Sequence, residues 1–268
     1  MRLSVVGLSM VPSSSAAIAA AQAPSEIAVV AAGSLRAALT EMASAFEQAH
    51  PGTRIKLTFG ASGLLKDRIQ GGERADVFAS ANLEHPQALA AAGKALPVRS
   101  FARNRLCALA APTIIVTSAT LIDRLLDPAI SLGTSTPKAD PSGDYAWAMF
   151  ERIERQGRAG AYAMPTRKAQ QLTGGPNSSP PPAGRSVYAS LVADGKADIF
   201  ITYCTNARLA ANEEPSLHVI DVPDSVNVGA DYGVTRMNDA APSAEAFVQF
   251  LLAVEGQRIL ARQGFSPP

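Results

Sequence analysis

The chain has 268 residues, of which 47% are apolar, and its formal net charge is +1. This length allows one large domain or two modest ones with ample core. A nearly neutral balance without a basic block argues against nucleic acid or an anionic membrane as the main partner.

The first 25 residues differ in kind from the rest of the chain. Arg2 precedes a short apolar run, and Ala21-Gln22-Ala23 forms an A-x-A cleavage pattern. These features predict a secretory signal peptide over residues 1–25, cleaved at about residue 23. No other apolar run approaches the roughly 20 residues that a membrane helix needs, so we expect a soluble, exported, periplasmic protein.

A strand, a short turn and a helix are predicted between Ile27 and Phe46. The apolar run Ile27–Ala32 breaks at Gly33-Ser34, and apolar residues then recur at helical spacing. Gly33 permits a sharp turn, and Ser34 stands where a helix N-cap belongs. Unpaired amides and a hydroxyl therefore meet at the positive end of a helix dipole, which suits an anion.

The same pattern recurs after the alternating strand Arg54–Phe59. Gly60-Ala61-Ser62-Gly63 leads into a second helix, which Gly71-Gly72 ends. A serine at such a position is often only a structural cap. Successive strands of a parallel sheet, however, bring their C-terminal ends to one edge, so we expect Ser34 and Ser62 to lie close together.

Strands and helices continue to alternate, which predicts an α/β fold with mostly parallel sheets covered by helices on both faces. The polar Arg103-Asn104-Arg105 marks a first crossing between domains, and 226–235 crosses back. The expected strands are 75–80, 106–110, 130–133, 197–203 and 217–222, and the expected helices are 84–92, 121–126, 207–212, 243–252 and 257–262.

Two further helix starts follow loops rich in hydroxyls, glycine and proline. Ser142 follows Pro141 and is expected to cap a helix, and Arg185-Ser186 opens another after the loop Thr173–Gly184. The apolar strand that ends at Tyr203 places an aromatic hydroxyl at its C-terminal end.

Signatures of catalysis and metal binding are absent from the sequence. His50, His85 and His218 stand alone, and no HExxH pattern or Cys/His cluster occurs. Gly60-Ala61-Ser62-Gly63 misses the G-x-S-x-G elbow because Leu64 replaces the last glycine. We therefore expect no enzyme activity, no cofactor and no metal site.

The chain has two cysteines, Cys107 and Cys204, nearly a hundred residues apart. This count excludes zinc fingers and CxxC redox motifs. The pair could form one disulfide or remain two buried thiols, and we favour thiols.

Six short motifs follow one another in a specific order and spacing. Together they resemble the periplasmic molybdate-binding proteins of ABC importers, a type II solute-binding family, from about Ile27 to Phe265. The motifs are Ala31–Leu35, Phe59–Leu65, Ala75–Ala81, Phe101–Leu106, Pro141–Tyr145, and Gly256-Gln257 with Gly264-Phe265.

The resemblance implies two α/β lobes with mixed sheets, joined by two crossing segments and closing on a tetrahedral oxyanion. Lobe 1 would comprise 26–104 plus 229–268, and lobe 2 would comprise 105–228. The implied ligand is molybdate or tungstate, and the implied partner of the monomeric protein is the membrane permease of an ABC importer.

Five residues match the family's ligand positions. Ser34 and Ser62 match hydroxyl ligands, Ser142 and Arg185 match backbone-amide donors, and Tyr203 matches the tyrosine that completes the cage. Lys138, Asp140 and the long 173–184 loop depart from the family's pattern.

Neutral donors at helix starts can hold a fully ionised dianion in a cleft shielded from water. Such a cage offers no acceptor for a protonated oxyanion, so monohydrogen phosphate would bury an unpaired O–H at a cost of about 1–3 kcal/mol. Sulfate is also a dianion, and its rejection would depend on cavity size.

Three alternatives remain open from the sequence. The ligand could be sulfate, thiosulfate or a small organic anion, which an inward-pointing Lys138 or Arg185 would favour. An exported hydrolase could use Ser62 or Ser142, given a histidine or lysine within about 3 Å. A ligand-sensing module that docks onto a membrane receptor would have the same sequence features.

Overall fold

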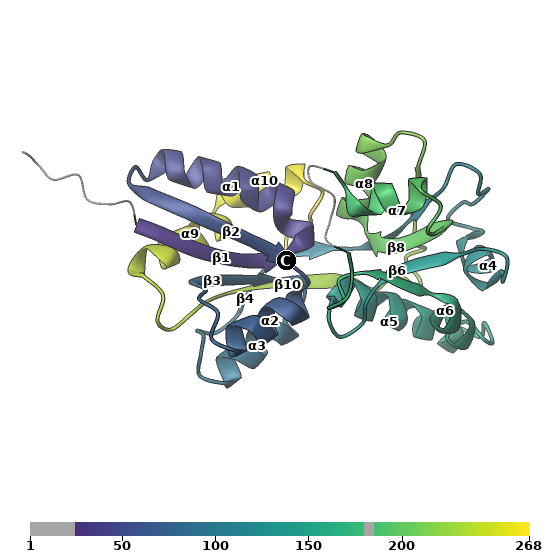
Figure 1. Ribbon diagram of the computed structural model, residues 1–268, viewed down its shortest axis with the longest axis horizontal. Coiled ribbons are helices and arrows are strands. Elements are labelled where there is room, and N and C mark those ends of the chain that lie inside the picture. The colour runs from purple at the N-terminus through teal and green to yellow at the C-terminus, as the bar shows by residue number, and fades with distance from the viewer. Residues whose placement is uncertain (1–24, 180–184) are drawn as a thin grey trace, which may run out of the picture.

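The computed structural model describes residues 25–179 and 185–268, which form two α/β lobes side by side (Figure 1). The predicted fold class, two lobes with mixed sheets flanked by helices, is confirmed. The predicted signal peptide lies almost wholly outside the described residues, as do the last residues of the 173–184 loop. No helix within the described ranges is long and apolar enough to cross a membrane.

The first lobe is built on a five-stranded sheet in the order β2-β1-β3-β10-β4. Its strands are β1 Ser25–Ala32, β2 Thr53–Gly60, β3 Val77–Ser80, β4 Arg99–Asn104 and β10 Ala230–Arg236. Its helices are η1 Gly33–Leu35, a 3-10 turn, α1 Arg36–Ala49, α2 Ser62–Gln70, α3 Glu84–Ala91, α9 Pro242–Leu252 and α10 Val254–Arg262.

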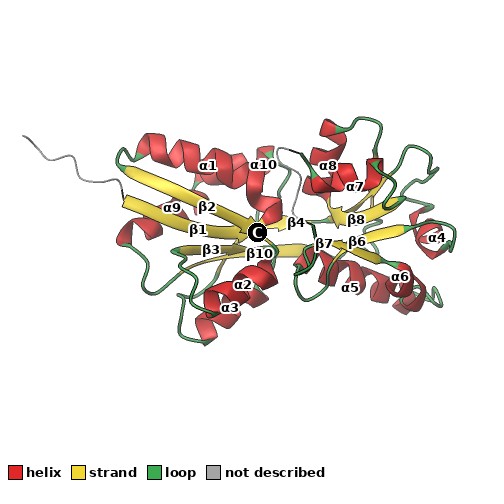
Figure 2. Ribbon diagram, in the orientation of Figure 1, coloured by secondary structure: helices red, strands yellow, loops and turns green. Residues whose placement is uncertain are grey.

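The second lobe has its own five-stranded sheet in the order β7-β6-β8-β5-β9. Its strands are β5 Leu106–Ala110, β6 Leu132–Ser135, β7 Gln170–Thr173, β8 Ile199–Tyr203 and β9 His218–Asp221. Helices cover both faces (Figure 2): α4 Leu121–Leu126, α5 Pro141–Arg155, α6 Ala163–Lys168, α7 Val187–Ala193 and α8 Cys204–Glu213.

Both sheets are mixed, and four of the five strands in each run in one direction, so the expectation of mostly parallel sheets holds for all but one strand of each sheet. β1 is parallel to β2 and β3, but β10 runs antiparallel to β3 and β4. In the second lobe, β5 likewise runs antiparallel to β8 and β9. The reason is the crossing itself, because a strand that enters from the other lobe runs against neighbours that end at the junction.

The paired ends of β1 and β2 confirm the expected meeting of two helix starts. The parallel register runs from Ser25 opposite Thr53 to Ala32 opposite Gly60. The chain turns into η1 and α1 directly after Ala32, and into α2 one residue after Gly60. Buried Leu39, Met42 and Phe46 hold α1 against this sheet.

The chain passes between the lobes at 104–106 and again at 221–230. The two crossings are neighbours, because Ala230 of β10 pairs with Asn104 of β4. The side chain of Asn227 joins them further: its Oδ1 accepts from the Leu106 amide at 3.1 Å, and its Nδ2 donates to the Leu106 carbonyl at 2.8 Å. The lobe boundaries at 104/105 and 228/229 stay a prediction.

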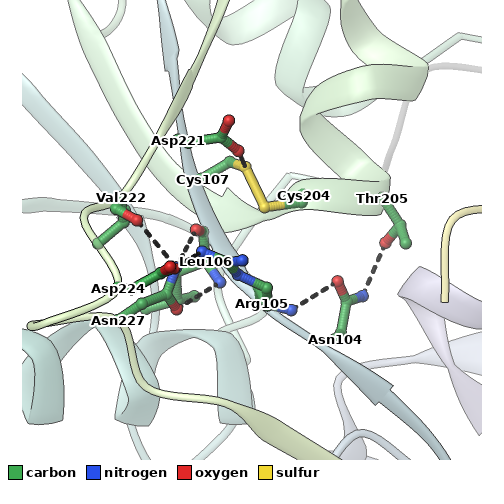
Figure 3. The surroundings of a disulfide bond; sticks show 10 residues. All are labelled: Asn104, Arg105, Leu106, Cys107, Cys204, Thr205, Asp221, Val222, Asp224 and Asn227. Carbon is green, nitrogen blue, oxygen red and sulfur yellow. Dashed lines mark hydrogen bonds and ion pairs between the residues drawn. A yellow bond between two sulfur atoms is a disulfide. The ribbon is translucent and has the colours of Figure 1, made fainter. Parts of the chain in front are cut away.

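Cys107 and Cys204 form a disulfide, so the preference for free thiols was wrong. Figure 3 shows the bond beside the first crossing. Cys107 of β5 pairs with Thr202 of β8, and the chain turns into α8 directly after Tyr203, so Cys204 lies at a Cα–Cα distance of 4.7 Å from Cys107. The bond therefore ties β5 to the first residue of α8.

We expect replacement of both cysteines by alanine to destabilise the second lobe. A disulfide that closes a long loop restricts the unfolded chain, and its loss typically costs about 2–5 kcal/mol. Urea unfolding of the C107A/C204A variant, followed by circular dichroism, should show a loss in this range. Reduction of the wild type should reproduce it, and equal midpoints for reduced and oxidised protein would contradict the prediction.

Candidate functional site

A cleft of about 720 Å³ is lined by residues of both lobes. Several helix N-termini open onto it, because lining residues stand at or beside the starts of η1, α2, α5, α7 and α8. These residues are, in chain order, Ser34, Ser62, Asp140, Ser186, Tyr203 and Thr205. Converging helix starts make the cleft favourable for negative charge.

Ser62 is the first residue of α2 and is buried. Its Oγ accepts a hydrogen bond of 3.1 Å from the backbone amide of Ala81, which follows β3. Because this amide occupies an acceptor position of the oxygen, the hydroxyl hydrogen remains to be donated. Ser62 can therefore present a neutral donor to the cleft.

Ser34 lines the same cleft but does not act as the expected helix N-cap. It lies inside η1, and within the part of the chain that the structure describes no side chain caps either η1 or α1. Its hydroxyl is instead 2.8 Å from the hydroxyl of Tyr232, a buried residue of β10. The local pattern could not reveal this bond, because its partners are 198 positions apart.

Tyr203 ends β8 and also lines the cleft. Its side chain is 2% exposed, and its hydroxyl has no hydrogen-bond partner among the described residues. Burial raises the pKa values of Tyr203 and Tyr232 well above their ordinary value, so both phenols stay protonated at neutral pH. A buried polar group without a partner is costly, and the Tyr203 hydroxyl therefore has a hydrogen to donate to a group in the cleft.

Ser142 departs from its expected role, whereas the expected backbone-amide role of Arg185 stays a prediction. Asp140, not Ser142, caps α5, and its carboxylate accepts from the Ser142 amide at 3.1 Å. The amide that the resemblance implied as a ligand donor is thus already engaged, and Ser142 does not line the cleft. Arg185 does line it, but its side chain is half exposed and pairs with Glu213 at 3.1 Å.

Asp140 introduces an acid into the cleft, which corrects the expectation of a cage without acceptors. Burial, only partly offset by the hydrogen bond from the Ser142 amide, raises the pKa of Asp140 from 3.8 to about 6. The carboxyl therefore changes charge close to neutral pH. The sequence identified Asp140 only as a departure from the family pattern.

The geometry offers no support for a serine hydrolase. Within the described part of the chain, neither a histidine nor a lysine lines the cleft, so Ser62 has no base there. Among the described residues, one group gathers possible metal ligands, Cys107, Cys204 and Asp221. The disulfide engages both of its sulfur atoms.

Residues 27–266 match the family model described as "Bacterial extracellular solute-binding protein". The chain belongs to this family. Solute-binding proteins of this kind serve ABC transporters and are not enzymes, in agreement with the expectation from the sequence.

Two relatives cover most of this solute-binding protein. An uncharacterized protein of Pasteurella multocida is 38% identical over 243 residues, which span 89% of this chain and 98% of that protein. The molybdate-binding protein ModA of Mycobacterium tuberculosis is 28% identical over 248 residues, which span 92% of this chain and 87% of that protein.

Solved structures show the same fold. The periplasmic molybdate-binding protein of Azotobacter vinelandii matches with a TM-score of 0.71 at 19% identity, covering 90% of this chain and 99% of that one. The sulfate-binding protein SubI of Mycobacterium tuberculosis also gives 0.71, at 17% identity and coverages of 91% and 87%.

The two lobes of this solute-binding protein touch beside Ser62. The amide of Gly63 in α2 donates to the carbonyl of Ala139 in the second lobe at 2.9 Å. A Cβ on Gly63 would lie 2.4 Å from the Lys138 carbonyl oxygen and 2.7 Å from that of Ala139. Only glycine permits this approach, because both obstructing atoms belong to the backbone.

We expect Gly63→Ala to separate the lobes on this side of the cleft. The added methyl should cost about 1–3 kcal/mol of stability and increase the radius of gyration measured by small-angle X-ray scattering. Gly71→Ala is the matched control, because Gly71 follows the other end of α2 and a Cβ added there would come no closer than 3.4 Å to the described residues. Equal scattering and stability for the two variants would contradict the role of Gly63.

Proposed function

We propose that this protein captures a tetrahedral oxyanion in the periplasm and delivers it as a monomer to the permease of an ABC importer. Molybdate is the proposed ligand, and tungstate is its close alternative. The observation that carries the proposal is that Ser34, Ser62 and Tyr203 line one cleft with converging helix starts. Mobility of the two lobes about the crossings would enclose the ion.

The donors fit a doubly negative ion because they are neutral and numerous. Ser62 retains a hydrogen to donate, and Tyr203 has a buried hydroxyl without a partner among the described residues. Hydrogen bonds from such groups to a charged acceptor are stronger than bonds between neutral groups. Neutral hydrogen-bond donors can therefore hold the charge of the ligand without a lysine beside it.

A second candidate ligand is a small organic anion. The cleft of about 720 Å³ falls in the range of sites for larger ligands, about 300–1,000 Å³. Arg36 and Arg185 line it, and Arg36 also lies over the Phe59 ring with 4.5 Å between Cζ and the ring centroid. A guanidinium can bind a carboxylate through two parallel hydrogen bonds.

Titration calorimetry of the mature protein against a panel of anions tests the proposal. We expect submicromolar affinity for molybdate or tungstate and weaker binding of phosphate, for which Asp140 is a possible acceptor of the O–H. Sulfate, thiosulfate and a small carboxylate complete the panel. Preference for phosphate or for a carboxylate would contradict the proposal, the latter in favour of the second candidate.

Removal of a single donor should weaken molybdate binding. Ser34→Ala, Ser62→Ala and Tyr203→Phe should each cost about 1–3 kcal/mol of binding free energy, because each removes one hydrogen bond to a charged ligand. Ser216→Ala, which alters an exposed hydroxyl bonded to Glu214 at 2.8 Å, is the control and should leave affinity unchanged. Unchanged affinity in all three variants would place the site elsewhere.

Molybdate binding should weaken as the pH rises above about 6. A bound dianion opposes the charged form of Asp140, so the pKa of this carboxyl must be higher in the complex than its value of about 6 in the free protein. At pH values above about 6, binding of molybdate is therefore coupled to the uptake of a proton by Asp140. The expected slope is at most tenfold in Kd per pH unit, and Asp140 should contribute no slope well below its free pKa.

Asp140→Asn should remove this pH dependence while it retains a helix cap. Asp144→Asn is the matched control, because Asp144 lies on the same helix without lining the cleft, and burial raises its pKa too. The charged residues Arg36, Arg185 and Glu213, which also line the cleft, are unchanged in both variants. Calorimetry from pH 5.5 to 8.5 measures the slopes, and equal slopes for wild type and Asp140→Asn would exclude the linkage.

A further inference from the structure

Asn104 is a buried polar residue at the point where the chain leaves the first lobe. Its side chain contacts groups from both lobes. Nδ2 is 2.9 Å from Oγ1 of Thr205 in α8 and 3.4 Å from the hydroxyl of Tyr232 in β10. Figure 3 shows Asn104 extending toward Thr205, beside the disulfide.

The orientation of this amide follows from its third contact. The backbone N–H of Arg105 lies 2.9 Å from the Asn104 side chain and can only donate. The atom that receives it must therefore be the carbonyl oxygen Oδ1, which turns the NH₂ group toward Thr205 and Tyr232. Both of these hydroxyl oxygens consequently accept.

Accepting from Asn104 leaves the hydrogen of each hydroxyl available for donation. Thr205 lines the cleft, is 8% exposed, and keeps its own hydrogen after its oxygen has accepted from Asn104. Tyr232, whose oxygen accepts from Asn104, has its own hydrogen available for the Ser34 hydroxyl at 2.8 Å, and when Tyr232 donates there the Ser34 hydrogen is left free. One amide thus favours a donating hydroxyl in each lobe.

We propose that Thr205 is a further donor to the bound anion and that Asn104 is a positioning residue, which turns the Thr205 and Ser34 hydrogens toward the ligand. This inference rests on the proposed function of the cleft as an oxyanion site. It adds one ligand contact from the second lobe. It also explains why an amide, which can donate twice and accept once, stands at the crossing.

A purely structural role for Asn104 makes a different prediction. Asn227 provides the comparison, because it is a buried asparagine at the other crossing whose side-chain amide, among the described residues, bonds only to the backbone of Leu106 and Val222. Loss of either asparagine would disturb the junction between the lobes. Only the loss of Asn104 would also disturb the Thr205 hydroxyl.

A double-mutant cycle measured by titration calorimetry separates the two roles. The variants are Asn104→Ala, Thr205→Val, their combination, and Asn227→Ala alone and with Thr205→Val, with molybdate and sulfate as probes. We expect Thr205→Val and Asn104→Ala each to raise Kd by about tenfold to a hundredfold. The rise in Kd of the Asn104→Ala/Thr205→Val double variant should be at least about fivefold smaller than the product of the two single rises, because Asn104 acts partly through Thr205.

Control variants distinguish a failure of this inference from a failure of the proposed function. Thr205→Ser, which keeps the hydroxyl, should have a Kd within about threefold of wild type. In the control cycle, the double variant of Asn227→Ala and Thr205→Val should show a rise in Kd equal to the product of the two single rises. Unchanged Kd in Thr205→Val, or multiplying losses in the Asn104 cycle, would overturn the inference while leaving the proposed function intact. If the wild type binds sulfate and not molybdate, the proposed ligand is wrong, and the cycle is then measured with sulfate as the probe. Binding of neither anion would overturn both.

Discussion

The parallel pairing of β1 with β2 is the constraint on which the binding cleft depends. The two strands remain in register up to Ala32 and Gly60, so the segments that follow them must emerge side by side. The hydroxyls of Ser34 and Ser62 then lie near the starts of two helices whose apolar faces hold them against one sheet.

Neutral hydroxyls make the cleft selective only if their hydrogens point in the right direction. A hydroxyl can donate or accept, and an undirected one gives a dianion little advantage over water. In this cleft, backbone or side-chain amides engage the oxygens of Ser62 and Thr205, which leaves the hydrogens available. The electrostatic character of the site therefore arises from hydrogen-bond direction and helix dipoles more than from net charge.

Local patterns in the sequence predicted much of the fold. The strand Leu106–Ala110 and the helix Leu121–Leu126 have the expected bounds. β4 was missed because its polar residues, among them Arg99 and Arg103, lack the alternation of a half-buried strand. β4 forms the edge of its sheet, where exposed polar side chains are tolerated.

The site was predictable where local sequence determines it and unpredictable where distant pairing does. Ser34, Ser62 and Tyr203 stand at recognisable strand ends, and all line the cleft. Thr205 and Tyr232 gave no local signal, because their bonds to Asn104 span 101 and 128 positions. The disulfide spans 97 positions and depends on the β5–β8 register in the same way.

The adjacency of the two crossing segments limits how the lobes can move. Asn104 opposite Ala230, and Asn227 bonded to Leu106, make the crossings a narrow two-stranded ribbon. Sliding one strand of a ribbon along the other would break its cross-links together, whereas flexing across its face preserves them. The geometry therefore favours rotation of the lobes about the two crossings, and one hinge angle then describes how far the inside of the cleft is exposed to water.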